Sequence, residues 1–217
     1  MFVKNHMTKN PVTVSENTPV LEAGAIMREQ GISRLLVMRD GKLVGIVTDK
    51  DLMRVSPSAA TTLSVFEVNY LLSKLTVKEV MTEKPKTISS GATLEEVAVL
   101  MRDNGIGALP VLEDGRLIGI ITESDIFDAF ISMMGLREAS SLVTLDIEDR
   151  VGILAEITQI IKDYGINIVT MATIANRAER RGELILRLDT KDPKPLVRDF
   201  EARGYRVTHV TNWKDRA

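Results

Sequence analysis

The sequence predicts a mixed α+β and α/β protein, in which two copies of one small unit are followed by a ferredoxin-like βαββαβ domain. Residues 3–54 and 77–128 align without a gap, 74 positions apart, and are identical at 21 of 52 positions. An ungapped internal repeat indicates two copies of one supersecondary unit that bury their apolar faces against each other. From Ser140 the repeat ends and a different strand and helix pattern begins. We therefore expect a duplicated module and a separate second domain.

Each copy of the repeat is predicted to run strand, helix, strand, strand, helix. In the first copy these elements are expected at 12–14, 18–31, 35–38, 43–47 and from 48 onward. Thr18 and Pro19 are typical of a helix N-cap and a first helical residue, and Gly31 is typical of a helix end. Asp40-Gly41 is typical of a two-residue hairpin turn. The second copy has the same pattern, with Thr93 to Glu96 as a capping box.

Residues 59–76, between the copies, are predicted to form a helical linker. A capping-box pattern at Ser64 to Glu67 precedes apolar residues at helical spacing. These residues are Val65, Val68, Leu71, Leu72 and Leu75. This face would bridge the two halves or form a dimer contact. After the second copy, a helix over 126–131 is expected to join the repeat to the last domain.

The C-terminal region has the pattern of a single βαββαβ domain. Its elements are expected as a strand over 143–147, a helix over 149–164, a hairpin of 168–175 with 183–188, a helix over 196–203 and a strand over 205–210. Val143, Leu145 and Ile147 alternate with polar residues, as in a half-exposed strand. Asp149 can cap the first helix, and Gly165 ends it. This element order specifies a ferredoxin-like sandwich with one helical layer.

Composition and charge argue against several classes of protein. The formal net charge is 28 − 30 = −2 and no long basic run occurs, so nothing favours nucleic-acid binding. No apolar stretch reaches the roughly 18 to 20 residues of a membrane span, and the N-terminus lacks the apolar segment of a signal peptide. The sequence contains no cysteine, which removes disulfides, thiolate catalysis and cysteine-based metal sites. A cytoplasmic location is the simplest expectation.

Motifs of the repeat resemble those of a known family. Met7-Thr8 recurs as Met81-Thr82, and residues 45–51 recur as 119–125, with the sequences GIVTDKD and GIITESD. On these residues the first part of the chain resembles tandem CBS domains, which form the Bateman module. The resemblance implies two related halves with a ligand cleft beside each.

The C-terminal domain resembles a second family. Asp149 to Leu154 and Gly165 to Ile168 are similar to the motifs of ACT domains. The order of domains and the linker sequence are similar to the AcuB group of acetoin-utilisation proteins. The expected domains are CBS domain 1 at 1–58, the helical linker at 59–76, CBS domain 2 at 77–134 and the ACT domain at 138–217.

The pattern Gly45-x-x-Thr48-x-x-Asp51 is a candidate nucleotide site with a physical rationale. The start of a helix carries unpaired N–H groups and a partial positive charge that favour a phosphate. The threonine hydroxyl can bond a phosphate or ribose oxygen, and the carboxylate can accept from ribose hydroxyls. A capping box without any ligand would explain the same two side chains. Both interpretations stay open.

The family resemblance implies an adenine nucleotide (AMP, ADP or ATP) or S-adenosylmethionine as a regulatory ligand, with no resident cofactor. The expected binding residues are Thr13, Val14, Arg34, Leu35, Thr48, Lys50 and Asp51 in the first copy, and Thr87, Ile88, Leu109, Pro110, Thr122 and Asp125 in the second. The copies differ in charge: Ala108 replaces Arg34, Ser124 replaces Lys50, and Asp128 replaces Arg54. We therefore expect the first site to bind adenine nucleotide more tightly and the second to suit a less charged ligand.

The resemblance to ACT domains implies an effector site at a dimer interface, formed by the turn before the first helix and the start of the next strand. The matching residues are Asp149, Val151, Gly152 and Asn167. Val151 stands where proline is usual, and Ile147 is apolar where some amino-acid binders place a polar contact. Sensing of an amino acid or another small effector and a purely dimerising role are both left open.

No catalytic or metal-binding constellation is visible in the sequence. The two histidines, His6 and His209, fall in different predicted domains, so neither a metal site nor an acid–base pair is expected. We interpret the chain as a non-catalytic, allosteric regulatory protein that responds to small-molecule effectors.

The expected partners follow from the same resemblance. A homodimer through the CBS and ACT domains and an unidentified regulated protein are expected, without nucleic-acid or membrane partners. The similarity to the AcuB group implies a role in acetoin or related carbon metabolism. The alternative is an oligomeric scaffold protein with vestigial ligand clefts.

Overall fold

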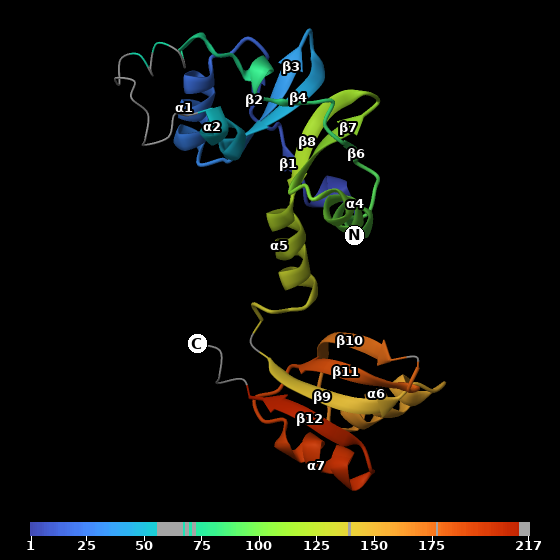
Figure 1. Ribbon diagram of the computed structural model, residues 1–217. Coiled ribbons are helices and arrows are strands. Elements are labelled where there is room, and N and C mark those ends of the chain that lie inside the picture. Colours follow the sequence, from blue (N-terminus) through green and yellow to red (C-terminus); the bar gives the residue numbers. More distant parts are fainter. Residues whose placement is uncertain (56–66, 68–69, 71–72, 139, 177, 213–217) are drawn as a thin grey trace. The chain divides into compact units, whose positions relative to one another are not determined.

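The computed structural model describes residues 1–55, 67, 70, 73–138, 140–176 and 178–212. The chain forms two compact units, Met1–Phe127 and Asp128–Ala217 (Figure 1). Most of the apolar face predicted for the linker, namely Val65, Val68, Leu71 and Leu72, lies outside the described residues. Leu75, the last member of that face, packs against the core of the first repeat.

The first unit contains both repeats. The elements of the first repeat are η1 (Val3–Asn5), β1 (Thr8–Lys9), β2 (Thr13–Ser15), α1 (Val20–Gln30), β3 (Arg34–Arg39), β4 (Lys42–Thr48) and α2 (Asp49–Val55). Those of the second are η2 (Val77–Glu79), β5 (Thr82–Glu83), β6 (Ile88–Ser89), α4 (Leu94–Asn104), β7 (Ala108–Glu113), β8 (Arg116–Thr122) and α5 (Glu123–Met133). The predicted order of strand, helix, strand, strand, helix is present in both copies, with one additional short strand before it.

The two repeats exchange their leading strands. One sheet has the order β2-β3-β4-β5 and the other the order β1-β8-β7-β6. Strand β5 of the second repeat therefore completes the sheet of the first, and β1 of the first repeat completes the sheet of the second. In each case the exchanged strand is antiparallel to its neighbour, with Glu83 opposite Gly45 and Lys9 opposite Gly119. These two-residue strands show no periodicity, and the sequence analysis did not predict them.

Backbone hydrogen bonds extend the exchange to the loops before the long helices. The amide of Val3 donates to the carbonyl of Ala92 at 2.9 Å, and the amide of Val77 donates to the carbonyl of Thr18 at 2.9 Å. Both valine side chains are completely buried. Each repeat therefore folds around a segment that the other repeat supplies.

Gly45 and Gly119 allow the exchanged strands to approach closely. A Cβ on Gly45 would overlap the Sδ of Met81, and a Cβ on Gly119 would lie 2.6 Å from the Sδ of Met7 and 3.0 Å from the carbonyl oxygen of Thr8. A glycine inside a strand commonly marks such a close approach. One contact explains why Met-Thr and this glycine recur in both copies. The Met-Thr pair of each repeat packs against the glycine of the other repeat.

The first long helix starts one residue later than predicted. Its N-cap is Pro19, with φ −60° and ψ 143°, and not Thr18. The repeat register explains the correction, since Pro19 aligns with Thr93. Thr93 caps α4, where its Oγ1 accepts from the amide of Glu96 at 3.2 Å, so the capping box predicted there is confirmed.

Aliphatic side chains form the core of the first repeat and the contact between the repeats. The core of the first repeat consists of Val14, Val20, Ala23, Met27, Leu35, Val37, Val47, Leu52 and Val77. A smaller cluster joins the two sheets and consists of Leu36, Ala108 and Ile120, with Leu43, Ile46 and Leu117 packed against them. Burial of one such side chain contributes about 1.5–3 kcal/mol. The predicted burial of apolar faces between the copies is confirmed.

The second unit is the predicted ferredoxin-like sandwich. Its elements are β9 (Ser141–Glu148), α6 (Ile153–Asp163), β10 (Ile168–Asn176), β11 (Arg181–Leu188), α7 (Lys194–Ala202) and β12 (Arg206–Thr211). The sheet has the order β10-β11-β9-β12, and every neighbouring pair is antiparallel. Side chains of α6 and α7 share one core with β9 and β11, which places both helices in a single layer (Figure 1).

Helix α6 begins later than predicted. Its N-cap is Gly152, in the left-handed region with φ 89°, and not Asp149. The amide of Asp149 instead donates to the carbonyl of Arg180 at 2.9 Å, which extends the strand pairing past the end of β9. The chain then needs the turn at residues 150–152 before it can enter the helix.

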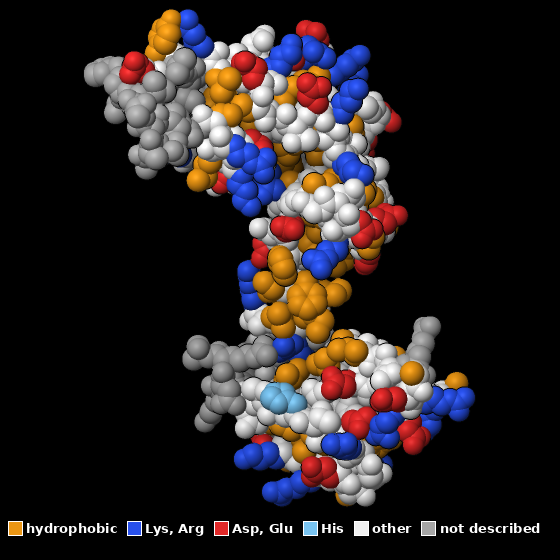
Figure 2. Space-filling model, in the orientation of Figure 1, with side chains coloured by type: hydrophobic (Ala, Val, Ile, Leu, Met, Phe, Trp, Pro, Cys, Tyr) orange, Lys and Arg blue, Asp and Glu red, His pale blue; other side chains and the backbone are white. Residues whose placement is uncertain are grey.

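Helix α5 crosses the boundary between the two units. Ala129 is buried, whereas Phe127, Phe130 and Met133 are 67%, 49% and 54% exposed. Figure 2 shows hydrophobic side chains gathered over this helix. The helix predicted over 126–131 is confirmed and is longer at both ends.

Candidate functional site

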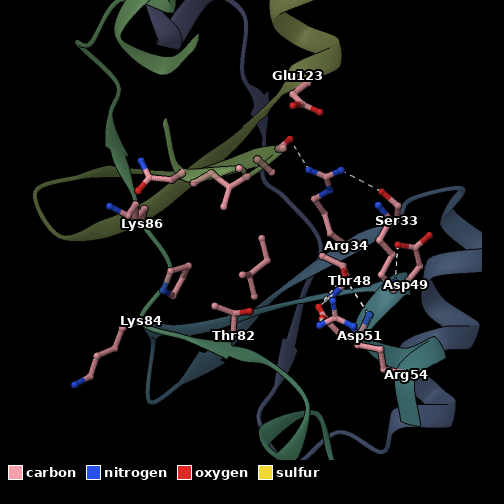
Figure 3. A pocket seen from close by; sticks show the side chains of 18 residues that line it. Ser33, Arg34, Thr48, Asp49, Asp51, Arg54, Thr82, Lys84, Lys86 and Glu123 are labelled. Carbon is pink, nitrogen blue, oxygen red and sulfur yellow. Dashed lines mark hydrogen bonds and ion pairs between the residues drawn. The ribbon is translucent and has the colours of Figure 1, made fainter. Parts of the chain in front are cut away.

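A cavity of about 670 Å³ lies between the two repeats of the first unit. The first repeat contributes the end of β4 and the start of α2, with Thr48 and Asp51. The second repeat contributes Thr82, the segments 84–86 and 104–108, and Glu123 (Figure 3). Because β5 is exchanged, the segment that follows it reaches this cavity beside the first repeat. The cleft expected beside the first copy is therefore lined by both copies.

Thr48 and Asp51 form a compact hydrogen-bonded pair at the cavity. The Oδ2 atom of Asp51 accepts from the Thr48 amide at 2.9 Å and from its hydroxyl at 2.6 Å, and the Asp51 amide donates to Thr48 Oγ1 at 3.3 Å. This is a capping box with aspartate as the acidic member. The capping interpretation therefore accounts for the hydrogen bonds of Asp51 Oδ2, and it does not involve Oδ1.

The second carboxylate oxygen of Asp51 points to a cation. Its Oδ1 lies 3.7 Å from the Nη1 of Arg54, whose side chain is 81% exposed, while that of Asp51 is 18% exposed. An ion pair with so exposed an arginine is weak, at about 0–1 kcal/mol. The oxygen therefore has acceptor capacity for a ligand at little energetic cost.

Arg34 extends across the cavity wall from the first repeat to the second. Its Nη1 donates to the carbonyl oxygen of Gly107 at 2.6 Å, and its Nη2 donates to the Oγ of Ser33 at 3.4 Å (Figure 3). A Cβ on Gly107 would lie 3.0 Å from the Oε2 of Glu123 and 3.8 Å from Arg34 Nη1. The absence of a side chain at Gly107 thus makes room for the Glu123 carboxylate, while the distance to Arg34 is an ordinary contact.

The cavity has an excess of positive charge. Its cationic lining residues are Arg34, Lys50, Arg54, Lys84 and Lys86, and its acidic ones are Asp49, Asp51 and Glu123. Their formal charges sum to 5 − 3 = +2. A cleft lined by one predominant sign of charge concentrates ligands of the opposite sign. The charge of the cavity therefore favours binding of an anionic ligand.

The second repeat has the same polar pair without the same cations. The Oδ2 of Asp125 accepts from the Thr122 amide at 2.7 Å and from its hydroxyl at 2.8 Å. The residues that take the repeat positions of the five cations are Ala108, Ser124, Asp128, Asn10 and Val12. Asp128, at the position of Arg54, pairs with Arg137 at 3.2 Å. The shared pair and the differing charges follow the expected asymmetry of the two copies.

The predicted nucleotide-binding residues fall into two groups. Arg34, Thr48, Lys50 and Asp51 line the cavity together. The remaining residues of both copies, Thr13, Val14, Leu35, Thr87, Ile88, Leu109, Pro110, Thr122 and Asp125, are not among its lining residues. Leu35 and Leu109 are completely buried in the sheets, and Thr13 and Val14 line a separate hollow of about 380 Å³.

The lining residues that the sequence analysis missed come mainly from the opposite repeat. Lys84, Pro85 and Lys86 follow the exchanged strand, and Ile106 and Gly107 follow α4. A repeat of identical pattern cannot show whether a segment serves its own copy or the other one. Their charge was the available signal, because Lys84 and Lys86 align with the uncharged Asn10 and Val12.

The ACT-like unit has a hollow of about 410 Å³ beside the start of α6. Asp149 and Gly152 line it, together with residues 173–175 near the end of β10 and Gly182 and Glu183 of β11. Val151 is completely exposed, and neither it nor Asn167 is among the lining residues. The structure thus brings two of the four predicted effector residues to one hollow.

Charged side chains cluster near that hollow. Arg150 donates two hydrogen bonds to Glu156, at 2.8 and 2.6 Å, and the Tyr205 hydroxyl donates to the same carboxylate at 3.1 Å. The hydrogen bonds from Arg150 and Tyr205 lower the pKa of Glu156, and partial burial together with the bond to Glu156 raises the pKa of Tyr205. The cluster connects the β9–α6 turn with the start of β12.

The described residues offer little for metal binding or for crossing a membrane. Among the described residues, no group of three or more histidine, aspartate and glutamate side chains is arranged to hold a metal ion. No helix in the described part of the chain is both long and apolar enough to cross a membrane. His209 bonds through Nε2 to the Oγ1 of Thr211 at 2.8 Å.

Comparison with known proteins agrees with this architecture. The CBS domain model matches residues 3–58 and 77–132, and the ACT domain model matches 141–204. The chain is 35% identical over 156 residues to inosine-5'-monophosphate dehydrogenase of Korarchaeum cryptofilum, covering 71% of this chain and 28% of that protein. It is 35% identical over 136 residues to a CBS domain-containing protein of Dictyostelium discoideum, covering 62% of this chain and 94% of the relative. It thus spans little more than a quarter of the dehydrogenase, and the activity of that enzyme does not transfer with the match.

Three solved structures are similar to about three fifths of this chain, and two of them contain a ligand. A Vibrio cholerae protein assigned to acetoin utilization (AcuB) has a TM-score of 0.53 and 29% identity, covering 64% of this chain and 96% of that one. CBSX2 in complex with AMP has a TM-score of 0.51 and 30% identity, covering 61% and 98%. The CBS domain pair of MJ0100, in complex with 5'-methylthioadenosine and S-adenosyl-L-methionine, has a TM-score of 0.50 and 29% identity, covering 61% and 97%.

Duplicated α/β units with exchanged strands, followed by a βαββαβ sandwich, define a regulatory module class. The chain belongs to the CBS domain family, as a tandem CBS pair with a C-terminal ACT domain.

Proposed function

We propose that the protein is a non-catalytic ligand sensor whose CBS pair binds an adenine nucleotide in the cavity between its repeats. The observation that carries the proposal is the position of Thr48 and Asp51 at a cavity of about 670 Å³ with an excess of cations. Sites for small ligands commonly have volumes of about 300–1,000 Å³. The crystal structures of CBS pairs with AMP or S-adenosyl-L-methionine support the class of ligand.

The proposed ligand contacts follow from the polar side chains that line the cavity. Asp51 would accept from ribose hydroxyls through Oδ1, since Oδ2 holds the cap. Arg34 and Lys50 would compensate the charge of a phosphate. Such a ligand would contact both repeats, so its binding would favour the packing in which both line the cavity. In the second repeat, the pair Thr122 and Asp125 would suit a less charged ligand, such as a nucleoside or S-adenosylmethionine.

The ACT unit is proposed to dimerise or to sense an amino acid or another small effector. Asp149 and Gly152 at the hollow beside α6 support an effector, and the 59% exposure of Ile174 on the same hollow supports a contact with a second copy. We propose a cytoplasmic homodimer that regulates an unidentified protein. The similarity to the Vibrio cholerae AcuB protein supports a role in acetoin or related carbon metabolism.

Calorimetric titration of the full chain tests the nucleotide site. The wild type, Asp51→Ala and Asp125→Ala are each titrated with AMP, ATP and S-adenosylmethionine. The two variants are matched controls, because each removes the acidic member of the same capping box. We expect Asp51→Ala to weaken AMP and ATP binding at least tenfold and Asp125→Ala to leave both nearly unchanged. An equal loss in both variants rejects the preference for the first cleft.

One observation favours a scaffold with vestigial clefts, because both polar pairs are already satisfied as capping boxes. Thermal unfolding with the same ligands separates the two functions. A ligand at about 100 times its Kd adds about 2.7 kcal/mol to the free energy of unfolding. A melting temperature that no ligand shifts would support the scaffold and reject the sensor.

A further inference from the structure

We infer that the exchanged segment 84–86 makes the first cleft selective for ligands with more phosphate groups, so that ATP binds more tightly than AMP, and AMP more tightly than adenosine. The inference rests on the proposed function of the cavity and adds the residues that set its charge selectivity. These are Lys84 and Lys86, which the second repeat supplies across the strand exchange.

The two lysines account for two unit charges of the difference between the clefts. In the first repeat the same positions hold Asn10 and Val12, both uncharged. The backbone is equivalent at both places, since the Lys84 amide donates to the carbonyl of Val44 at 3.0 Å and the Asn10 amide donates to the carbonyl of Ile118 at 3.4 Å. The two repeats therefore have the same backbone geometry at these positions but different side-chain charges.

The backbone at Lys84 argues for selection on charge. Lys84 has φ 47° and Asn10 has φ 50°, both in the left-handed region. Asparagine is several-fold enriched in that region, whereas a lysine there is uncommon. The first repeat has the residue that suits the conformation, and the second has a cation in its place. A ligand that requires the charge explains a residue that the backbone does not favour.

The position of the lysines suits a selective role. Both are exposed at the rim of the cavity, on the side opposite Thr48 and Asp51, and their side chains extend toward solvent (Figure 3). Lysine has a flexible four-carbon stem, so its ammonium group can move toward a phosphate. Charges on the rim of a site chiefly raise the association rate and its dependence on salt. Each additional phosphate would increase that attraction, and adenosine would be insensitive to it.

The test replaces the segment with the residues of the other repeat. Full-length wild type and Lys84→Asn/Lys86→Val are titrated with ATP, AMP and adenosine at low and high salt. Lys78→Asn is the control for the loss of a cation outside the cavity, because Lys78 is exposed in η2 and is not among the lining residues. Lys84→Asn should fold at least as well as the wild type, since it places asparagine at a left-handed position.

We expect the double variant to lose about tenfold in ATP affinity, less in AMP affinity and less than twofold in adenosine affinity. The salt dependence of ATP binding should fall in the same variant and stay unchanged in Lys78→Asn. Three results would overturn the inference alone. The double variant could lose ATP and adenosine affinity equally, its ATP affinity could be unchanged, or the wild type could bind all three ligands equally. A wild type that binds none of the three overturns the proposed function itself.

Discussion

Single residues at equivalent repeat positions explain why the two copies keep some identities and vary others. Gly45 and Gly119 face the methionines of the exchanged strands, so a side chain is excluded at both. Other positions change in pairs. Arg39 bonds to Glu16 at 3.3 Å in the first copy, and in the second copy Glu113 accepts from Ser90 at 2.6 Å at the same two positions. The contact is kept although both residues differ.

The close contact at Gly45 predicts a steric effect of substitution. Gly45→Ala should lower the free energy of unfolding by about 1–3 kcal/mol, because the added methyl group overlaps Met81 and the surrounding strands must shift. The measurement is urea unfolding of the full chain. Adding Met81→Ala should recover part of the loss, which makes the pair non-additive. Strictly additive losses would show that Met81 is not the obstacle.

The ion pairs of Asp146 predict a dependence on pH. Its hydrogen bonds from Arg181, at 3.0 and 2.8 Å, lower the pKa of its carboxyl group. A carboxyl with a lowered folded pKa stabilises the protein above its unfolded value of about 4, and this contribution is lost as the pH falls through the folded pKa. The urea concentration at the unfolding midpoint of the ACT-like unit should therefore decrease as the pH is lowered from about 7 to about 3. The decrease should be smaller in Arg181→Met.

Arg198→Met is the matched control for this prediction. Arg198 is exposed on α7 and lies outside the group formed by Asp146, Arg181 and Arg206. Its loss should leave the pH dependence of the urea midpoint as in the wild type. A pH dependence that Arg181→Met does not reduce would contradict a stabilising role of this pair.

At the scale of the elements, the strand exchange predicts that a change in one repeat loosens the other. Val77→Ala should cost about 2 kcal/mol, because it opens a cavity around a completely buried side chain. The affected backbone lies in the first repeat, where the Val20 amide donates to Leu75 and the Val77 amide donates to Thr18, both at 2.9 Å. Amide hydrogen exchange should therefore speed up at the start of α1 more than at the start of α4.

Val3→Ala provides the mirror experiment. The Val3 amide bonds to the carbonyl of Ala92, and the Leu94 amide bonds to the carbonyl of Met1. Hydrogen exchange should accordingly speed up at the start of α4 and not at that of α1. If each valine instead loosened its own repeat, the exchanged arrangement would be wrong.

The same exchange shows how far the sequence could predict the fold and the site. The long helices and the hairpins carry clear periodicity and turn residues, and they lie where the patterns predicted them, apart from the later starts of α1 and α6. Strands β1 and β5 have two residues each and no periodicity. Because the copies share one pattern, the sequence did not show that Lys84 and Lys86 line the cavity beside Thr48. On the first repeat's own side of that cavity, Arg34, Thr48, Lys50 and Asp51 were predicted, and the lining residues from the opposite repeat were not.

For the whole molecule, α5 is the element that belongs to both units. It starts at Glu123, directly after Thr122, and continues to Met133, past the boundary between Phe127 and Asp128. After it, the hydroxyl of Thr170 on β10 donates to the carbonyl oxygen of Met134 at 3.2 Å, which ties the end of the connection to the ACT sheet. A ligand in the CBS pair can affect the ACT unit only through a difference in affinity between two states, typically about 1–3 kcal/mol of coupling.

Ala129→Pro should interrupt this route. Proline in a helix interior removes one hydrogen bond and clashes with the preceding turn, at a cost of about 3 kcal/mol or more. We expect ATP affinity to stay within about threefold of the wild type, since Ala129 is not among the residues that line the cavity. Hydrogen exchange of residues 140–212, measured with and without ATP, should lose the response that the wild type shows. Ala129→Gly weakens the helix by only about 1 kcal/mol and keeps the amide, so it should keep part of that response. A proline variant whose ACT unit responds to ATP as the wild type does would exclude α5 as the route, because the helix could not remain continuous in that variant.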